Sequence, residues 1–600
     1  MHGAAASAVA LTDELGPLPE WDLSDLYPSP DCPQLEADLK AADRAAQAFQ
    51  RCCQGKLAEI SGDALGDAIA EYERLTETLY RVLSYAQLRY SANVSDEERA
   101  RFYQSIQERV TAISTQTLFF SLELNRLDDA TLADKLVSPK TAHYQSWLRD
   151  LRMFRDHQLS DEMEQVLHER EVVGRCAWVR LFDETMAGLR FQVEGRPLTS
   201  AETLHLMSDK SAEKRQAAAK AFGAGLAQNI RLFTLITNTL IKEKEIDDRW
   251  RRYPRPTSYR NLSNQVEDDV VDALVQAVRG AYSQLSHRYY AMKAKWFGVE
   301  QLDYWDRNAP LPEDEDRPIP WAAARDTVLG AYRAFSPQLA ELGGRFFDHG
   351  WIDAPARPGK SSGAFAHPTV PSAHPYLLLN YLGKTRDVMT LAHELGHGVH
   401  QVLAAGKGQL MADTPLTLAE TASVFGEMLA FRAVLDAETA PARRRIMLAA
   451  KVEDMLNTVV RQVAFYEFER AIHEERRRGE LSAERIGEIW TEIQHQSLGP
   501  SLRFHEEYRY YWCYIPHFIH TPFYVYAYAF GDCLVNSLYD VYRGGATGFQ
   551  EKYIDMLKAG GTLRHKDLLA PFGLDAGDPA FWRRGLDIIV GFIDELEEMS

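Results

Sequence analysis

Apolar residues recur at three- and four-residue spacing over long stretches of this 600-residue chain, with charged residues between them. This spacing is typical of amphipathic helices, and it runs through residues 63–91, 96–127 and 211–250. Long amphipathic helices need partners that cover their apolar faces. We therefore expect an all-α, mainly helical fold, with an N-terminal helical lobe over residues 1–200 and a second domain over residues 201–600.

One region departs from the helical pattern. Residues 355–385 are rich in Gly, Pro and Ser and contain the apolar run "YLLLNY" at Tyr376–Tyr381. This composition predicts a loop and a small β element of one or two strands. An edge strand at this point can pair with the main chain of an extended peptide, and a purely structural hairpin fits the same residues equally well.

The charge and cysteine content exclude several classes of protein. Lys and Arg number 67 against 86 Asp and Glu, so the net charge is −19 and neither nucleic acid nor an anionic membrane is expected as the main partner. No run of 18 apolar residues predicts a transmembrane helix. Six cysteines without a CxxC pair fit a reduced compartment, so we expect a cytoplasmic protein, as monomer or homo-oligomer.

The stretch "TLAHELGHGVHQ" at Thr390–Gln401 lies in a predicted helix over about residues 386–404. Gly383 precedes this helix, Thr385 is the expected N-cap, Asp387 is a first-turn acid and Gly406 follows the end. At 100° per residue one stripe of the helix is apolar and the opposite stripe carries His393, His397 and His400. The histidine stripe is therefore turned away from the core.

His393 and His397 are stacked one helical turn apart, so both imidazoles can reach one zinc ion. Glu394 beside them completes the HExxH pattern and is the predicted general base. His400 lies about 10 Å along the axis from His393, which is too far for all three to share one ion. We expect His400 to support the site or line a cleft.

Two glycines inside this helix, Gly396 and Gly398, each cost about 1 kcal/mol relative to alanine. They predict close approach by another backbone or by a substrate.

A catalytic zinc ion needs a third protein ligand and an open position. The residues after the histidine motif predict an antiparallel helix over about 415–432, whose acids are Glu420 and Glu427. Thr417 and Glu420 match a capping box, but proline prefers the first helical position, so Pro415 places Glu420 inside the helix. We therefore predict Glu420 as the third metal ligand and Glu427 as a partner of an imidazole N–H.

A late segment, Phe504–Phe530, has twelve aromatic residues in 27. An aromatic core is one explanation. Histidines and tyrosine hydroxyls are mixed in, however, and buried hydroxyls need partners. On a helix over about residues 517–536, His517, His520, Tyr524 and Tyr528 lie near one face.

Several of these motifs together resemble the oligoendopeptidase F family, relatives of thimet oligopeptidase. The resemblance rests on "PYLLLNYLGKTRDVMTLAHELGHGVHQ" (375–401), "LAETASVFGE" (418–427), "WDLSDLYPSP" (21–30) and "IPHFIHTPFYVYAYAFG" (515–531), and it runs almost end to end. It implies two helical lobes around a deep cleft that admits oligopeptides and excludes folded proteins. It also implies metal ligation by His393, His397 and Glu420.

The resemblance implies further that a histidine and tyrosines of the late segment bind the substrate carbonyl and stabilise the oxyanion. The tyrosine spacing differs by about one residue from that of thimet oligopeptidase. Tyr524, Tyr526 and Tyr528 are therefore all candidates, with Tyr524 and Tyr528 favoured.

The sequence thus predicts a zinc-dependent endopeptidase for short peptides, with one Zn²⁺ per chain in the domain over residues 201–600. A zinc carboxypeptidase or dipeptidyl carboxypeptidase is the main alternative, and it would need a cation for the C-terminal carboxylate of its substrate. A non-catalytic zinc-stabilised scaffold is a remote alternative. Structural zinc sites usually have four protein ligands, and only three are found here.

Overall fold

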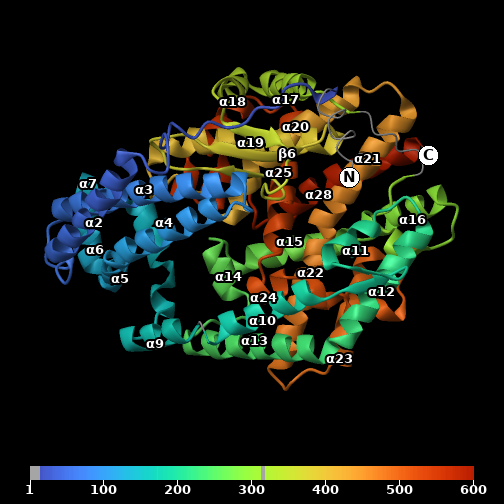
Figure 1. The fold of residues 1–600 in the computed structure, drawn as a ribbon, viewed down its shortest axis with the longest axis horizontal. Coiled ribbons are helices and arrows are strands. Elements are labelled where there is room, and N and C mark those ends of the chain that lie inside the picture. Colours follow the sequence, from blue (N-terminus) through green and yellow to red (C-terminus); the bar gives the residue numbers. More distant parts are fainter. Residues whose placement is uncertain (1–13, 172, 312–317, 600) are drawn as a thin grey trace. The chain divides into compact units, whose positions relative to one another are not determined.

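The computed structural model describes residues 14–171, 173–311 and 318–599, and these residues form a mainly helical protein with three small sheets (Figure 1). The expected all-α class is confirmed. The chain divides into two compact units, each built from three separate stretches. This division differs from the single boundary expected at residue 200, because helices distant in sequence pack together and periodicity along the chain does not reveal which ones do.

The first unit consists of the described residues of Met1–Arg155, Asp316–Ala437 and Val541–Gly573. Its helices are α2 (Pro33–Cys53), α3 (Gly62–Ala92), α4 (Glu97–Thr115), α5 (Leu118–Arg126), α6 (Asp129–Leu136), α7 (Pro139–Ala142), α8 (Gln145–Leu151), α17 (Trp321–Phe335), α18 (Pro337–Asp348), α19 (Thr385–Ala404), α20 (Leu416–Ala437), α26 (Phe549–Lys558) and α27 (His565–Leu569). The helix expected at 63–91 is α3, whereas the one expected at 96–127 breaks between α4 and α5 at Gln116 and Thr117.

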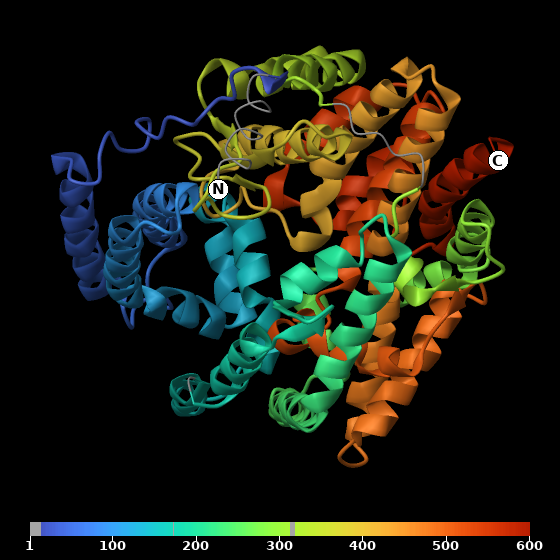
Figure 2. The ribbon, with the colours of Figure 1, turned by 45° about the vertical axis from the view of Figure 1, so that its right-hand side comes forward.

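The second unit consists of the described residues of Asp156–Glu315, Glu438–Asp540 and Leu574–Ser600. Its helices are α9 (Asp161–Glu171), α10 (Arg175–Gly188), α11 (Ser200–Leu206), α12 (Ala212–Gln228), α13 (Ile230–Trp250), α14 (Ser258–Ser263), α15 (Asp268–Ala281), α16 (Ser286–Trp296), α21 (Pro441–Thr458), α22 (Val460–Arg476), α23 (Ala483–Leu498), α24 (His517–His520), α25 (Tyr526–Arg543, whose last turn belongs to the first unit) and α28 (Pro579–Glu598). In Figure 2, α22 and α23 are the orange pair that packs side by side.

The small β element expected before the histidine helix is present as a three-stranded sheet in the order β4–β6–β5. Strand β6 (Tyr376–Tyr381) pairs in parallel with β4 (Ile352–Pro355) and antiparallel with β5 (Phe365–His367). The sheet packs against α19, and α18 contacts the same helix (Figure 1). Strand β5 is an edge of this sheet and lies beside α19. The other strands form two-stranded pairs, β1 (Phe191–Val193) with β2 (Arg196–Leu198) and β3 (Leu302–Asp303) with β7 (Leu502–Arg503).

Within the described ranges, every helix is either too short or too polar to cross a membrane. All six cysteines lie in these ranges and have free thiols.

Candidate metal centre

The histidine helix α19 begins directly after Gly383, whose φ of +82° turns the chain out of β6. The carboxylate of Asp387 accepts hydrogen bonds from the backbone N–H groups of Leu382 (2.8 Å) and Lys384 (3.0 Å). The N-cap position is Lys384 and not Thr385 as expected, and Asp387, the third residue of the helix, reaches back to the N–H of this cap residue. The helix ends at Ala404 and continues as a 3₁₀ turn over Ala405–Lys407.

The two glycines of α19 permit close packing. A Cβ atom on Gly396 would lie 2.5 Å from the carbonyl oxygen of Ala422 and 2.7 Å from the Cα of Ser423, both in the backbone of α20. A Cβ atom on Gly398 would lie 2.6 Å from the ring of Phe346 on α18. Of the two explanations that the sequence left open, Gly396 thus accommodates another backbone, which brings α20 against the face that carries the histidines.

We expect Gly396→Ala to lower the free energy of unfolding by about 1–3 kcal/mol, because the contact is with backbone that cannot move aside. This loss outweighs the gain in helix propensity of about 1 kcal/mol that alanine brings. Thermal or urea unfolding measures it. Gly330→Ala on α17 is the matched control and should stabilise the protein. Apart from its chain neighbours and the adjacent backbone of its own helix, no atom of the described residues lies within 4 Å of a Cβ there. Equal stabilisation by both variants would contradict the close approach of α20.

The register of α20 follows from proline at its start. The carbonyl oxygen of Pro415 accepts from the N–H groups of Leu418 and Ala419, and the helix begins at Leu416, two residues after the expected cap Thr414. Glu420 therefore lies inside the helix and takes no part in a capping box. The Ser423 hydroxyl donates to Glu420 Oε2 at 2.6 Å and fixes the carboxylate on the face towards α19.

His393, His397 and Glu420 come together as the one group in the described part of the chain whose His, Cys, Asp or Glu atoms could hold a metal ion. Glu420 Oε2 lies 3.3 Å from His393 Nε2 and 3.5 Å from His397 Nε2, and the three ligand atoms lie within 4.8 Å of one another. Ligands at 2.0–2.2 Å from a tetrahedral zinc ion are about 3.4 Å apart. Two imidazoles and one carboxylate at this spacing fit a zinc-type ion with a fourth position left open.

The carboxylate of Glu427 orients one of these imidazoles. Its Oε2 lies 3.1 Å from His393 Nδ1, so a proton on Nδ1 leaves Nε2 for the ion. Burial alone would lower the pKa of His393, but the two carboxylates outweigh burial and raise that pKa to about 10. Burial raises the pKa of Glu420, but the hydrogen bond to His393, the charges of the two imidazoles and the Ser423 hydrogen bond together outweigh burial and lower that pKa to about 2. An incoming metal ion has to displace the His393 proton, so metal affinity is expected to rise with pH.

We expect Glu427→Leu to weaken metal binding by about 10- to 100-fold, because it removes the partner that orients His393. Competition with a chelator of known affinity measures the change. Glu427→Gln is the matched control and should lose less, since its amide oxygen still accepts from Nδ1. Unchanged affinity in Glu427→Leu would show that the contact does not orient the ligand.

Glu394 lies beside the ligands and next to the edge strand. It is only 8% exposed, and burial raises its pKa to about 7 against the opposing effects of the His393 ring and the Ala366 backbone N–H. Ala366 is the central residue of β5. His400 is also buried, which lowers its pKa to about 4, and it lies outside the group of three ligands.

The aromatic segment is not the continuous helix expected over residues 517–536. It consists of the four-residue helix α24, a turn, and α25, which begins at Tyr526. Pro522 causes the break, because proline disfavours helical geometry in the preceding residue and lacks the N–H of a helix interior. Thr521 is accordingly not helical, with φ −146° and ψ 75°, and Phe523 has a left-handed φ of 59°.

Three of the four side chains predicted to share a face still lie together. The rings of His517, Tyr524 and Tyr528 contact one another with centroids 5.3–5.9 Å apart, and His517 Nε2 lies 3.4 Å from the Tyr528 hydroxyl. His520 is turned away and its Nε2 lies 2.7 Å from Asp183. Tyr526, the other candidate, is fully buried, and its hydroxyl accepts from Asn264. We call His517, Tyr524 and Tyr528 the Tyr/His group.

Two buried tyrosines that the sequence did not single out hold the ligand helices. The Tyr332 hydroxyl on α17 donates to the carbonyl oxygen of Ala392 at 2.7 Å, directly before His393. The Tyr553 hydroxyl on α26 donates to the carbonyl oxygen of Thr421 at 2.8 Å, directly after Glu420. A buried tyrosine in a helix looks like any core aromatic residue in the sequence. Only Gly426 hints at the first contact, since a Cβ there would lie 2.2 Å from the Tyr332 hydroxyl.

Two family models and several known proteins match this chain. The model of "Peptidase family M3" matches residues 334–588, and the model of "Oligopeptidase F" matches residues 123–191. The oligopeptidase PepF of Bacillus subtilis is 24% identical over 96% of this chain and 87% of its own length. An oligoendopeptidase F homolog of Borreliella burgdorferi is 25% identical over 98% and 99%.

Solved structures share the fold. A crystal structure from Chlamydophila abortus, assigned as a peptidase, superposes with a TM-score of 0.86 at 22% identity and covers 98% of this chain and 99% of its own. Oligoendopeptidase-F from Enterococcus faecium superposes with a TM-score of 0.70 at 21% identity, over 94% and 97%.

A helical fold with an HExxH helix, a glutamate from the next helix and these relatives defines a metallopeptidase that hydrolyses peptides. The two family models together match more than half of the chain. The chain belongs to the oligoendopeptidase F group of peptidase family M3.

Proposed function

We propose that this protein is a zinc-dependent endopeptidase that cleaves short oligopeptides. The observation that carries the proposal is the spacing of Glu420 Oε2 from His393 Nε2 (3.3 Å) and His397 Nε2 (3.5 Å), which fits three corners of a tetrahedron. Glu394 lies next to this set on the same helix. The names of the relatives, oligopeptidase and oligoendopeptidase, support the choice of short peptides as substrates.

A zinc ion held by these three residues would supply a Lewis acid and make a water molecule more acidic. Glu394 accepts the proton of the attacking water and then delivers it to the nitrogen of the leaving amine. Burial suits Glu394 to this role, because a pKa raised to about 7 lets the carboxyl both take and give a proton near neutral pH. Glu427 keeps the His393 ring oriented through both steps.

The free edge of β5 is the proposed docking site for the substrate main chain. A peptide that adds to this edge as a strand would have its backbone hydrogen-bonded alongside Ala366, whose N–H is near Glu394. Such binding would recognise backbone more than side chains. It also requires an extended substrate, in keeping with short, unfolded peptides.

For the Tyr/His group we propose a role in binding the substrate carbonyl and stabilising the oxyanion. These three side chains are half-exposed within a segment that is otherwise mostly buried. Burial lowers the pKa of His517, so its imidazole is neutral at physiological pH. Tyrosine hydroxyls and a neutral imidazole are donors of the kind that can stabilise developing negative charge, and the 3.4 Å contact of His517 Nε2 with the Tyr528 hydroxyl holds two of them together.

Hydrolysis of one peptide in four forms tests the endopeptidase assignment. A peptide of about ten residues is prepared free, N-acetylated, C-amidated and blocked at both ends, and the products are identified by mass spectrometry. We expect internal cleavage of all four forms. Loss of cleavage whenever the C-terminus is amidated would identify a carboxypeptidase or dipeptidyl carboxypeptidase instead. An inactive protein that retains zinc would favour a scaffold.

A further inference from the structure

The turn between α24 and α25 holds its backbone in an unfavourable conformation. Phe523 has a φ of 59° although it is not glycine, and its side chain is fully buried. A left-handed conformation at such a residue is unfavourable and persists only where the surroundings enforce it. Tyr524, the next residue, belongs to the Tyr/His group. The backbone of Phe523 therefore sets where the Tyr524 ring is placed.

Carbonyl groups on the N-terminal side of Phe523 are held by two arginines of the second unit. Arg175 donates to the carbonyl oxygens of Ile519 (2.8 Å) and His520 (2.9 Å). Arg260 donates to the carbonyl oxygen of Pro522 at 3.3 Å. These bonds fix the end of α24 but do not reach Phe523 itself.

Phe523 itself is held by one face of α22. Glu469 Oε1 accepts the hydrogen bond of the Phe523 N–H at 2.9 Å. The ring of Phe523 contacts His473 and Tyr466, with centroids 4.7 and 6.0 Å apart. Residues 466, 469 and 473 lie on one side of the helix, so a single face of α22 contacts both the backbone and the ring of Phe523.

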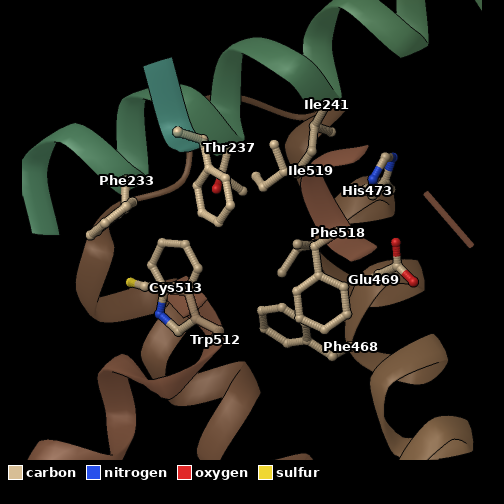
Figure 3. Close-up of a pocket in the computed structure, with 12 residues that line it drawn as sticks. Phe233, Thr237, Ile241, Phe468, Glu469, His473, Trp512, Cys513, Phe518 and Ile519 are labelled. Atoms are coloured by element: carbon tan, nitrogen blue, oxygen red, sulfur yellow. The ribbon is translucent and has the colours of Figure 1, made fainter. Parts of the chain in front are cut away.

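The carboxyl group of Glu469 is buried and only partly hydrogen-bonded (Figure 3). It is 1% exposed, and its Oε2 has no hydrogen-bond partner among the described residues. It lines a small cavity of about 10 Å³, room for a single water molecule, whose other walls are mainly apolar. Burial raises the pKa of Glu469 to about 8, although Lys244 and Arg260 are close enough to lower it. A buried carboxyl group with one oxygen left without a hydrogen-bond partner is costly, so stability alone does not explain it.

We propose that Glu469 is a positioning residue, whose carboxyl oxygen Oε1 anchors the backbone N–H of Phe523 and so keeps Tyr524 in contact with His517 and Tyr528. This inference rests on the proposed function of the Tyr/His group. Glu469 touches no substrate in this account. It acts only through the turn.

The test is the pair Glu469→Leu and Glu469→Gln, assayed with the blocked peptide. Leucine leaves the buried Phe523 N–H without an acceptor, so we expect kcat to fall about 10- to 100-fold, as for a displacement of a catalytic group by about 1 Å. KM should stay within about threefold, and metal content at one ion per chain. Glutamine keeps an acceptor oxygen, so kcat should stay within about threefold of the parent. Unchanged kcat in Glu469→Leu, or equal losses in both variants, would overturn the proposal.

Glu453→Gln controls for lost stability, because it weakens a buried ion pair with Lys293 in the same unit and does not touch the turn. It should lower the melting temperature and leave kcat unchanged. If Glu469→Leu does not fold, Glu469→Met removes the same acceptor with an unbranched side chain of closer length, and it should lower kcat by a similar factor.

Separate measurements test the role of Glu469 and the role of the Tyr/His group. If Tyr524→Phe and Tyr528→Phe keep full kcat, the role of the Tyr/His group is wrong. The crystal structure of Glu469→Leu, or of Glu469→Met, then still decides the positioning. We expect Phe523 to leave its φ of 59° and Tyr524 to leave its stack on His517, now 5.9 Å between centroids. A turn that stays unchanged would overturn the proposal.

Discussion

Replacing Glu394 with glutamine should lower kcat for the blocked peptide by about 10³- to 10⁴-fold, which is the upper range for loss of a general base. Glutamine has nearly the same shape as glutamate but cannot accept and return a proton. Glu394 is not among the three metal ligands, so the variant should still bind one metal ion per chain. Steady-state kinetics and metal analysis of the same preparation measure both quantities.

The burial of Glu394 explains why the expected loss of kcat is large. The side chain is 8% exposed, so bulk water has little access to replace it as a base. Glu394→Asp is the matched control, because it keeps a carboxylate but withdraws it by one methylene, and its loss should be smaller than that of glutamine. Should Glu394→Gln retain more than a tenth of the parental kcat, Glu394 is not the base.

The second large effect concerns metal binding. We expect Glu420→Ala to raise the metal dissociation constant by about 10²- to 10³-fold. Four ligands together supply about 10–16 kcal/mol of binding free energy in structural zinc sites. About a quarter of this free energy for one ligand corresponds to the expected change in the dissociation constant. Glu427, the other acid on this face of α20, is engaged with His393 Nδ1 at 3.1 Å and so does not take the place of Glu420. Competition with a chelator, followed by titration of zinc back into the stripped protein, measures the change.

Ser423→Ala is the control for this variant. It removes the hydroxyl that donates to Glu420 Oε2 at 2.6 Å but leaves the carboxylate in place, so the affinity should fall by about tenfold at most. Peptidase activity should follow the fraction of metal-loaded protein in both variants. A Glu420→Ala protein that binds zinc as tightly as the parent would remove Glu420 from the ligand set.

The candidate metal centre was predictable because its residues are linked by local rules. Helical spacing places His393 and His397 on one side of α19, and Pro415 at the start of the next helix fixes the register that turns Glu420 inwards. Gly396 signals that the two helices approach closely. Each of these inferences needs only neighbouring residues and the geometry of one helix.

Other features depend on residues that are far apart in the sequence. The left-handed conformation of Phe523 is enforced by Glu469, 54 positions away. The turn at this point interrupts the helix, so helical spacing alone wrongly placed His520 on the face of Tyr524 and Tyr528. Pro522 was visible as a helix breaker, but the direction of the chain after it was not. The two units are built from interleaved stretches, which a pattern read along the chain does not show.

Anomalous diffraction at the zinc edge, from crystals of the zinc-loaded protein, tests the central claim most directly. We predict one zinc peak per chain, about 2.0–2.2 Å from His393 Nε2, His397 Nε2 and a Glu420 oxygen, with solvent as the remaining ligand. A Glu420 side chain turned away from the zinc, or a fourth protein atom in the solvent position, would contradict the account.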